Sequence, residues 1–213
     1  MSARFITQAI AALLLVALGA TWISPAIAEP LTTVDLSSPA IRCVFSTSPH
    51  CNLDGTTTAG AIAIPGITGT AVLHTLTFPA FADSDAAGTY GYEYRFDLSQ
   101  ATAGPTKACI ARLTVETGPI RKLPYTGRHE TLFDVFVQNT HVAGMVGVAS
   151  AERSGKSVTF TFAKPICPGA GADKGETSYF FGFAAAAKPR EITAKVELDS
   201  GVTLDVAARA PAP

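Results

Sequence analysis

Four histidines are the side chains of this sequence best suited to acid–base chemistry: His50, His74, His129 and His141. A hydrolase would need a Ser or Cys nucleophile beside a histidine that a carboxylate orients, and the sequence has no G-x-S-x-G elbow. His74 alternates with apolar residues, which is typical of a hydrogen-bonded core residue, and His129 lies in a charged run between Arg128 and Glu130. We therefore predict no catalytic residue. The alternative, a hydrolase, requires His129 or His74 beside a carboxylate in a cleft.

Two short clusters of oxygen-bearing side chains could contribute to a calcium site. Asp83 and Asp85 are separated by one residue, as are Asn52 and Asp54. Alternating donors of this kind can bind Ca²⁺, but neither cluster supplies the remaining ligands of an EF-hand loop. Clusters of Asp and Asn more often form turns. We therefore predict no metal ligand and no cofactor.

The pentapeptide Leu123–Gly127 has the sequence L-P-Y-T-G and matches the L-P-x-T-G pattern of sortase substrates. In that family the motif lies near the C-terminus and is followed by an apolar segment and a basic tail. Here 86 residues follow it, and they have the pattern of core strands. We interpret the match as a coincidence in a proline-containing loop.

A row of aromatic side chains could form a binding platform for sugars. It contains Tyr90, Tyr92 and Tyr94, and the same alternation continues into Phe96 and Leu98. A sugar platform does not need this continuation, so we interpret the row as the buried face of an antiparallel strand over residues 90–98. The opposite face is predicted to be solvated and mostly charged. Its residues are Gly91, Glu93, Arg95 and Asp97.

Four cysteines follow the first 28 residues: Cys43, Cys51, Cys109 and Cys167. An even number of cysteines in an exported chain indicates two disulfides. Of the three pairings we favour Cys43–Cys51 with Cys109–Cys167, and we expect the second to connect two layers because Cys109 lies on the apolar face of its strand. Loop entropy gives about 2.6 kcal/mol for the short bridge and about 4 kcal/mol for the long one. A zinc site is the alternative, but no pair has the close C-x-x-C spacing.

Strand patterns separated by turn residues recur after residue 28, and none of that part shows a sustained helical period. This favours an all-β fold, an antiparallel β-sandwich of roughly 8–10 strands, with a closed barrel as second choice. We predict one domain over residues 29–206 and a disordered tail over residues 207–213. Ser157–Ala184 is predicted to form a central core hairpin, and Ile41–Phe45 a short strand.

Residues 1–28 have the features of a cleavable signal peptide. Arg4 supplies a positive start, Ile10–Leu18 is an apolar run, and Ala26–Ala28 gives the small-x-small cleavage pattern. A retained membrane helix is the alternative, but a glycine and a proline interrupt the apolar stretch. We expect export through the Sec pathway to the periplasm or the medium, with a mature chain that starts at Glu29 and does not contact the membrane.

The charge of the chain also restricts its partners. Of the 16 basic residues, 15 remain without Arg4, against 17 acidic ones, so the mature chain has a formal net charge of −2. Binding to nucleic acid requires a basic face, and we therefore expect no nucleic-acid partner.

Three segments together resemble a group of exported bacterial proteins of unassigned function: Val158–Phe162, Pro165–Cys167 and Thr177–Gly182. The likeness covers roughly residues 90–196. It implies a secreted β-sandwich and brings no catalytic residue. Because no catalytic set was found either, we expect a non-enzymatic binding or structural module with an unknown protein or glycan partner.

Overall fold

The structure is a computed structural model that describes residues 28–37, 40–105, 107–139 and 145–212. Within these ranges the protein consists of two β-sheets, as the sequence predicts, and its α-helix is limited to the short α1 (Ala40–Phe45). The predicted signal peptide lies outside the described residues, apart from Ala28. None of the described helix is long and apolar enough to cross a membrane.

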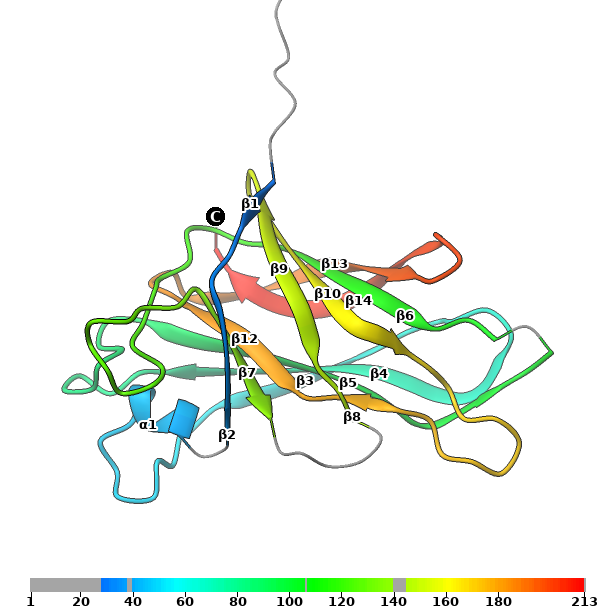
Figure 1. Ribbon diagram of the computed structural model, residues 1–213, viewed down its shortest axis with the longest axis horizontal. Helices are drawn as coiled ribbons and strands as arrows, with labels where there is room; N and C mark the ends of the chain where they lie inside the picture. Colours follow the sequence, from blue (N-terminus) through cyan, green and yellow to red (C-terminus); the bar gives the residue numbers. More distant parts are fainter. Residues whose placement is uncertain (1–27, 38–39, 106, 140–144, 213) are drawn as a thin grey trace, which may run out of the picture.

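The two sheets form stacked layers, and one of them curls into a half-barrel (Figure 1). The six-stranded sheet has the spatial order β1 (Glu29–Pro30), β9 (Val148–Ser154), β10 (Ser157–Ile166), β6 (Ile110–Glu116), β13 (Pro189–Leu198) and β14 (Thr203–Pro211). The eight-stranded sheet has the order β2 (Thr33–Ser37), β7 (Val135–Asn139), β12 (Phe180–Ala185), β5 (Tyr90–Ala103), β11 (Thr177–Ser178) and β8 (Met145–Val146). In that sheet β4 (Ile67–Pro79) also pairs with β5, and β3 (Thr56–Ala61) pairs with β4.

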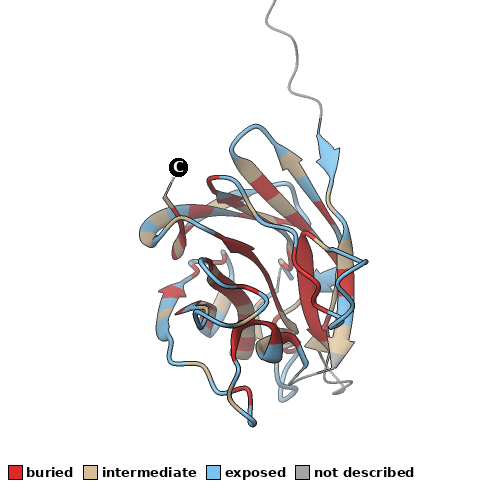
Figure 2. Ribbon diagram, turned by 90° about the vertical axis from the view of Figure 1, so that its left-hand side faces the viewer, coloured by how far each residue is buried: buried red, intermediate tan, exposed pale blue. Residues whose placement is uncertain are grey.

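Aromatic side chains fill the space between the two layers. Figure 2 shows buried residues along the strands and exposed ones mainly in the loops. Phe160 on β10 contacts Phe181 and Phe183 on β12, with ring centroids 4.9 and 6.3 Å apart. Tyr92 and Tyr94 are fully buried in the same core. The interpretation of these two tyrosines as core residues is therefore confirmed.

The predicted hairpin over Ser157–Ala184 is wrong in its strand pairing. β10 lies between β9 and β6 in the six-stranded sheet, whereas β12 lies between β7 and β5 in the eight-stranded sheet. Alternating apolar residues determine which face of a strand is buried, but they do not determine its neighbour. The two strands consequently face each other across the core instead of sharing hydrogen bonds.

A second apolar cluster lies on the outer face of the eight-stranded sheet and includes residues of α1. The strand predicted for this segment is wrong because its apolar residues have the i, i+3, i+4 spacing that places them on one face of a helix. These buried residues are Ile41, Val44 and Phe45. The Phe45 ring packs edge-to-face on Phe78 of β4, with centroids 5.1 Å apart. The helix thereby covers part of a sheet face that was predicted to be solvated.

Both favoured disulfides are present, Cys43–Cys51 and Cys109–Cys167, with sequence separations of 8 and 58. The expectation that the second connects two layers is wrong. Cys109 directly precedes β6 and Cys167 directly follows β10, and these strands are neighbours in the six-stranded sheet. The bridge therefore joins the ends of two paired strands beyond the register shift in β10.

The C-terminal strand is a full member of the six-stranded sheet. β13 and β14 form the hairpin expected from the sequence, and β14 continues to Pro211. The Tyr94 hydroxyl donates a hydrogen bond of 2.8 Å to the Arg209 carbonyl oxygen, which ties β14 to the core. The disordered tail predicted from residue 207 is therefore wrong for the described residues.

Candidate functional site

Glu93 occupies an unexpected position for a carboxylate, since only 1% of its surface is exposed. It lies on the outer face of β5, the face predicted to be solvated. Its cross-strand neighbours are Leu76 on β4 and Gly182 on β12, and neither has a polar side-chain atom. The segment around α1 covers this part of the sheet. A carboxylate is thus enclosed beside residues that cannot hydrogen-bond to it.

Arg42 of α1 is the nearest charged partner of Glu93. Its Nη2 atom lies 3.6 Å from Glu93 Oε1, an ion pair longer than a hydrogen bond. The Arg42 side chain is 37% exposed, so it reaches from solvent over the buried carboxylate. Burial raises the pKa of Glu93 above its usual range, and the charge of Arg42 offsets part of this rise. A group of this kind in a pocket is a candidate functional group.

Arg95 provides a second guanidinium group on the same face of β5. Its guanidinium carbon lies 5.2 Å from the centre of the Phe180 ring, which is a cation–π contact. The aromatic ring restricts the orientation of the guanidinium group on one side. Arg95 therefore presents a fixed positive group two residues along the strand from Glu93.

These residues line one pocket of about 310 Å³, which we call the Glu93 pocket. Its lining residues are Arg42, Thr57, His74, Leu76, Glu93, Arg95 and Phe180. Three of these residues have buried polar atoms, four in total, without a hydrogen-bond partner within the described structure. They are both carboxylate oxygens of Glu93 and the Nε atoms of Arg42 and Arg95. The pocket thus combines two positive donors and two negative acceptors with an aromatic wall.

His74 belongs to this pocket and not to the core, so its predicted position is wrong. Leu73 and Thr75 face inward and are fully buried, and His74 lies on the outer face opposite Arg95. It also contributes to the field at Asp97. Partial burial raises the pKa of Asp97, but hydrogen bonds from Ser99 and the charges of Arg95 and His74 outweigh it and leave the pKa below its usual range. Both faces of β4 carry apolar residues, so the sequence pattern does not show which face is buried and His74 was assigned to the wrong one.

No family model, curated protein or solved structure matches the chain. The chemistry of the Glu93 pocket is therefore derived from its own side chains. Small-molecule sites are mostly apolar concavities with a few converging polar groups, and the pocket has Leu76 and Phe180 beside its charged residues. This composition suits the binding of a small polar molecule.

The other histidines do not form a hydrogen-bonded pair with a carboxylate in the described ranges. His129 Nε2 lies 3.9 Å from Asp85 Oδ1, and both side chains are exposed to solvent, at 74% and 39%. His50 is exposed. His141 lies outside the described residues. The His–carboxylate arrangement that a hydrolase requires is therefore not formed by His129, whereas His74 lines the same pocket as the buried Glu93.

The remaining sequence candidates lie away from the Glu93 pocket. Asp83 accepts a hydrogen bond of 3.5 Å from the Thr47 hydroxyl. Over the described residues, no three His, Cys, Asp or Glu side chains cluster in a way that could hold a metal ion. Leu123 and Tyr125 of the L-P-Y-T-G segment are buried in the second apolar cluster, beside α1. That pentapeptide is therefore part of the folded domain.

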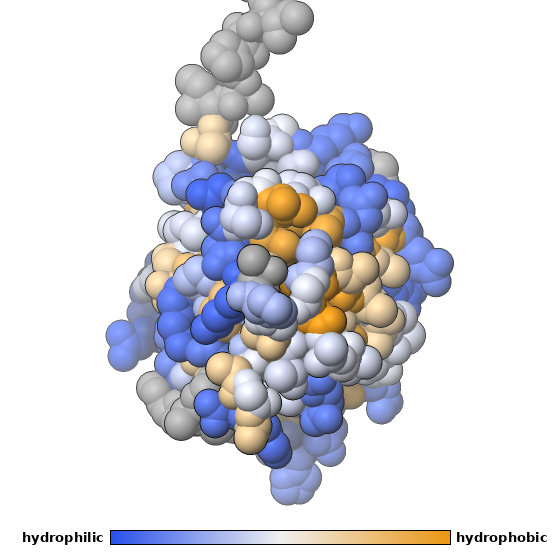
Figure 3. Space-filling view, turned by 90° about the vertical axis from the view of Figure 1, so that its right-hand side faces the viewer, coloured by the Kyte–Doolittle hydropathy of each residue, from blue (hydrophilic) through white to orange (hydrophobic). Residues whose placement is uncertain are grey.

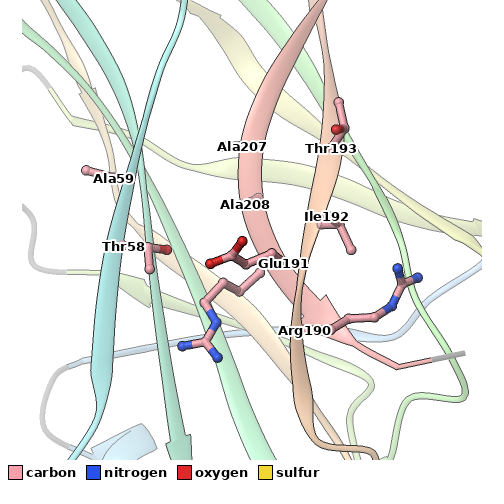
Figure 4. A pocket seen from close by; sticks show the side chains of 9 residues that line it. Thr58, Ala59, Arg190, Glu191, Ile192, Thr193, Ala207 and Ala208 are labelled. Atoms are coloured by element: carbon pink, nitrogen blue, oxygen red, sulfur yellow. The ribbon is translucent and has the colours of Figure 1, made fainter.

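A larger cleft of about 620 Å³ lies between β3 and the β13–β14 hairpin (Figure 4). Figure 4 shows Glu191 of β13 pointing toward Thr58 of β3. Glu191 is exposed and stands opposite Arg209 in the hairpin register, although the two side chains form no ion pair in the structure. Arg190 and Arg209, which line this cleft, also have buried Nε atoms without a hydrogen-bond partner among the described residues, but its carboxylate, Glu191, is exposed, in contrast to Glu93.

The end of the molecule that lies on the right in Figure 1 carries apolar surface. Figure 3 shows apolar side chains gathered among polar ones on this end. The turn between β13 and β14 lies there (Figure 1), and its Val202 is 46% exposed. Single exposed apolar residues are normal on soluble proteins, so the exposure of Val202 does not by itself indicate a binding site. We therefore place the candidate functional site at the Glu93 pocket.

Proposed function

We propose that this protein is a non-enzymatic binding module that is exported to the periplasm or the medium and binds a small polar ligand in the Glu93 pocket. Its two disulfides suggest an oxidising compartment outside the cytoplasm. The observation that carries the proposal is the buried Glu93 carboxylate, whose two oxygens have no hydrogen-bond donor although two guanidinium groups line the same pocket. A ligand would supply the missing partners.

The energetics favour a binding role over a purely structural one. A buried polar atom without a partner costs about 1–3 kcal/mol, and more when it is charged. A structural ion pair would compensate for this cost with direct hydrogen bonds, but the Arg42–Glu93 contact is 3.6 Å long. An apolar residue beside Leu76 and Gly182 would pack there without this penalty. The unfavourable arrangement is therefore understandable if it serves the recognition of a ligand.

A hydrolase that uses a His–carboxylate pair is the alternative function, because His74 and Glu93 line the same pocket. The geometry supports it less well. The residue directly opposite His74 is Arg95, a cation, so a carboxylate does not orient the imidazole there. The pocket contains one hydroxyl side chain, that of Thr57, and no hydrogen bond joins it to His74 in the described structure. Binding without turnover is therefore the function that we propose.

The proposal is tested by a ligand screen on the purified mature protein. A library of small metabolites and mono- and disaccharides would be screened by thermal shift, with every positive compound measured again on Glu93→Gln. A ligand present at a hundred times its dissociation constant stabilises the folded state by about 2.7 kcal/mol. We expect at least one compound to stabilise the original protein and to lose this effect in the variant.

The matched control is Glu130→Gln, which makes the same change at an exposed position outside the pocket. It should respond to the compound as the original protein does. Two results would contradict the proposal. One is a screen without any compound that depends on Glu93, and the other is turnover of ester, peptide or glycoside substrates that His74→Ala abolishes.

A further inference from the structure

The partnerless polar atoms of the Glu93 pocket define the chemistry of the ligand more closely. Two are acceptors, on the carboxylate of Glu93, and two are donors, the Nε atoms of Arg42 and Arg95. We propose that the ligand is a small zwitterion of the amino-acid class, with a protonated amine and a carboxylate on the same carbon atom. This inference rests on the proposed function and specifies the ligand of the same pocket.

The amine is assigned to Glu93. This carboxylate is enclosed by Leu76 and Gly182 in the neighbouring strands, and its contact with Arg42, at 3.6 Å, is longer than a hydrogen bond. An ammonium group carries three donors and one positive charge, so it can satisfy the carboxylate and neutralise it at the same time. A neutral hydroxyl would supply one hydrogen bond and no positive charge.

The carboxylate of the ligand is assigned to the two arginines. A guanidinium group presents a planar fork of donors that matches the two oxygens of a carboxylate. The contact with Phe180 holds the fork of Arg95 in place, and Arg42 reaches over the pocket from α1. Both Nε atoms are buried without a partner among the described residues, so each guanidinium group has an unused donor at the wall of the pocket.

The charge of the pocket distinguishes between ligands of this class. Arg42 and Arg95 contribute two positive charges and Glu93 contributes one negative charge, which leaves the pocket positive. A ligand with only an amine would encounter two guanidinium groups, and a ligand with only a carboxylate would leave Glu93 without a donor. The remaining positive charge should favour amino acids with neutral or acidic side chains over basic ones. The volume of about 310 Å³ restricts the site to small molecules.

The test compares molecules that differ in one functional group. Isothermal titration calorimetry on the mature protein would measure L-alanine, L-glutamate and L-lysine beside lactate, propionate and ethylamine. We expect L-alanine to bind at least about tenfold more tightly than lactate, propionate or ethylamine, because lactate and propionate lack the ammonium group assigned to Glu93 and ethylamine lacks the carboxylate assigned to the two arginines. L-Glutamate should bind at least as tightly as L-alanine, and L-lysine more weakly.

Two variants test which side chain of the pocket contacts the amine of the ligand and which contacts its carboxylate. Glu93→Gln should reduce the affinity for L-alanine at least about tenfold and bring it to the level of lactate, because the charged acceptor is lost. Arg95→Lys should weaken L-alanine and propionate alike, because the lysine ammonium has no fork. Glu130→Gln and Arg128→Lys are the matched exposed controls and should bind as the original protein does. Circular dichroism spectra would verify that each variant is folded.

The results separate this inference from the proposed function. Equal affinity for L-alanine, lactate and propionate would overturn the zwitterion and leave a binding pocket that prefers acids. A Glu93-dependent ligand without an amine, such as a neutral sugar, would also overturn it and would still support the proposed function. Absence of binding by all six probes overturns the inference, and absence of any Glu93-dependent ligand in the wider screen overturns both.

Discussion

The two disulfides should contribute unequally to stability, and the difference can be calculated from the fold. The Cys109–Cys167 bridge closes a loop with a sequence separation of 58 and the Cys43–Cys51 bridge one of 8. In the chain-entropy model, these loops correspond to about 4 and about 2.6 kcal/mol at 25 °C. Removal of the long bridge should therefore destabilise the protein by about 1.5 kcal/mol more than removal of the short one.

The assay is equilibrium unfolding in urea of two double variants, one for each bridge, with both cysteines changed to alanine. Midpoints and slopes would be compared with those of the oxidised protein, because a change in slope reports a changed denatured state. The original protein under reducing conditions serves as the control and should lose about as much stability as the two variants together. The reasoning is refuted if the Cys43–Cys51 variant is the less stable of the two.

Three further predictions concern the core and the pocket. Phe160→Ala should lower the free energy of unfolding by about 3–5 kcal/mol because it leaves a cavity between the sheets, while Phe81→Ala at a 37% exposed position should change it far less in the same urea assay. At Gly182 a Cβ atom would lie 1.8 Å from a carbonyl oxygen of β5, so Gly182→Ala should cost about 1–3 kcal/mol. Gly147→Ala, where the nearest atom is 3.5 Å away, should be nearly neutral in thermal unfolding. The raised pKa of Glu93 means that the folded state holds its proton to higher pH than the unfolded state. This contribution to stability is complete below the usual carboxyl pKa of 4.5 and is lost as the pH rises through the folded value. Glu93→Gln should remove this pH-dependent loss of stability, so the melting temperature of the variant, relative to that of the original protein, should rise as the pH increases. A constant difference in melting temperature from pH 4 to 8 would contradict the assignment.

Much of the fold can be predicted from local patterns. The alternation over residues 90–98 predicts both a strand and its buried tyrosine face, because burial on one side of a strand imposes a period of two. The C-terminal hairpin follows from two alternating runs around Asp199–Gly201, and the structure confirms it. The cysteine count predicts two bridges. Each of these features depends on residues that are close in the sequence or on a simple count.

Strand partners depend on contacts that are distant in the sequence. β10 and β12 have similar aromatic alternation. Nothing in that pattern indicates that β10 belongs to the six-stranded sheet and β12 to the eight-stranded sheet. The tail after residue 207 has few large residues, and its alanines become buried only because β13 and Tyr94 lie beside them. Small side chains can be strand residues where neighbours approach closely, which composition alone does not reveal.

The Glu93 pocket was not predicted because its enclosure comes from another part of the chain. Glu93 and Arg95 have the pattern of solvated positions on an amphipathic strand, but Glu93 is buried and pairs with Arg42 of α1, a segment distant in the sequence. The available signal was the spacing of Ile41, Val44 and Phe45, which indicates an apolar helical face that must cover a surface elsewhere. That spacing predicts a covered surface but does not identify which charged residue lies beneath it.

The central claim is that Glu93 is a buried carboxylate that receives its hydrogen-bond donor from a ligand. Carbon-detected NMR on protein labelled at the glutamate carboxyl groups, with Glu93→Gln used for assignment, would follow its titration directly. We predict that Glu93 titrates above the usual carboxyl range in the free protein and that saturating L-alanine lowers its pKa, because an ammonium partner favours the charged form. A Glu93 signal that titrates in the usual range and does not respond to any ligand in the screen would contradict the account.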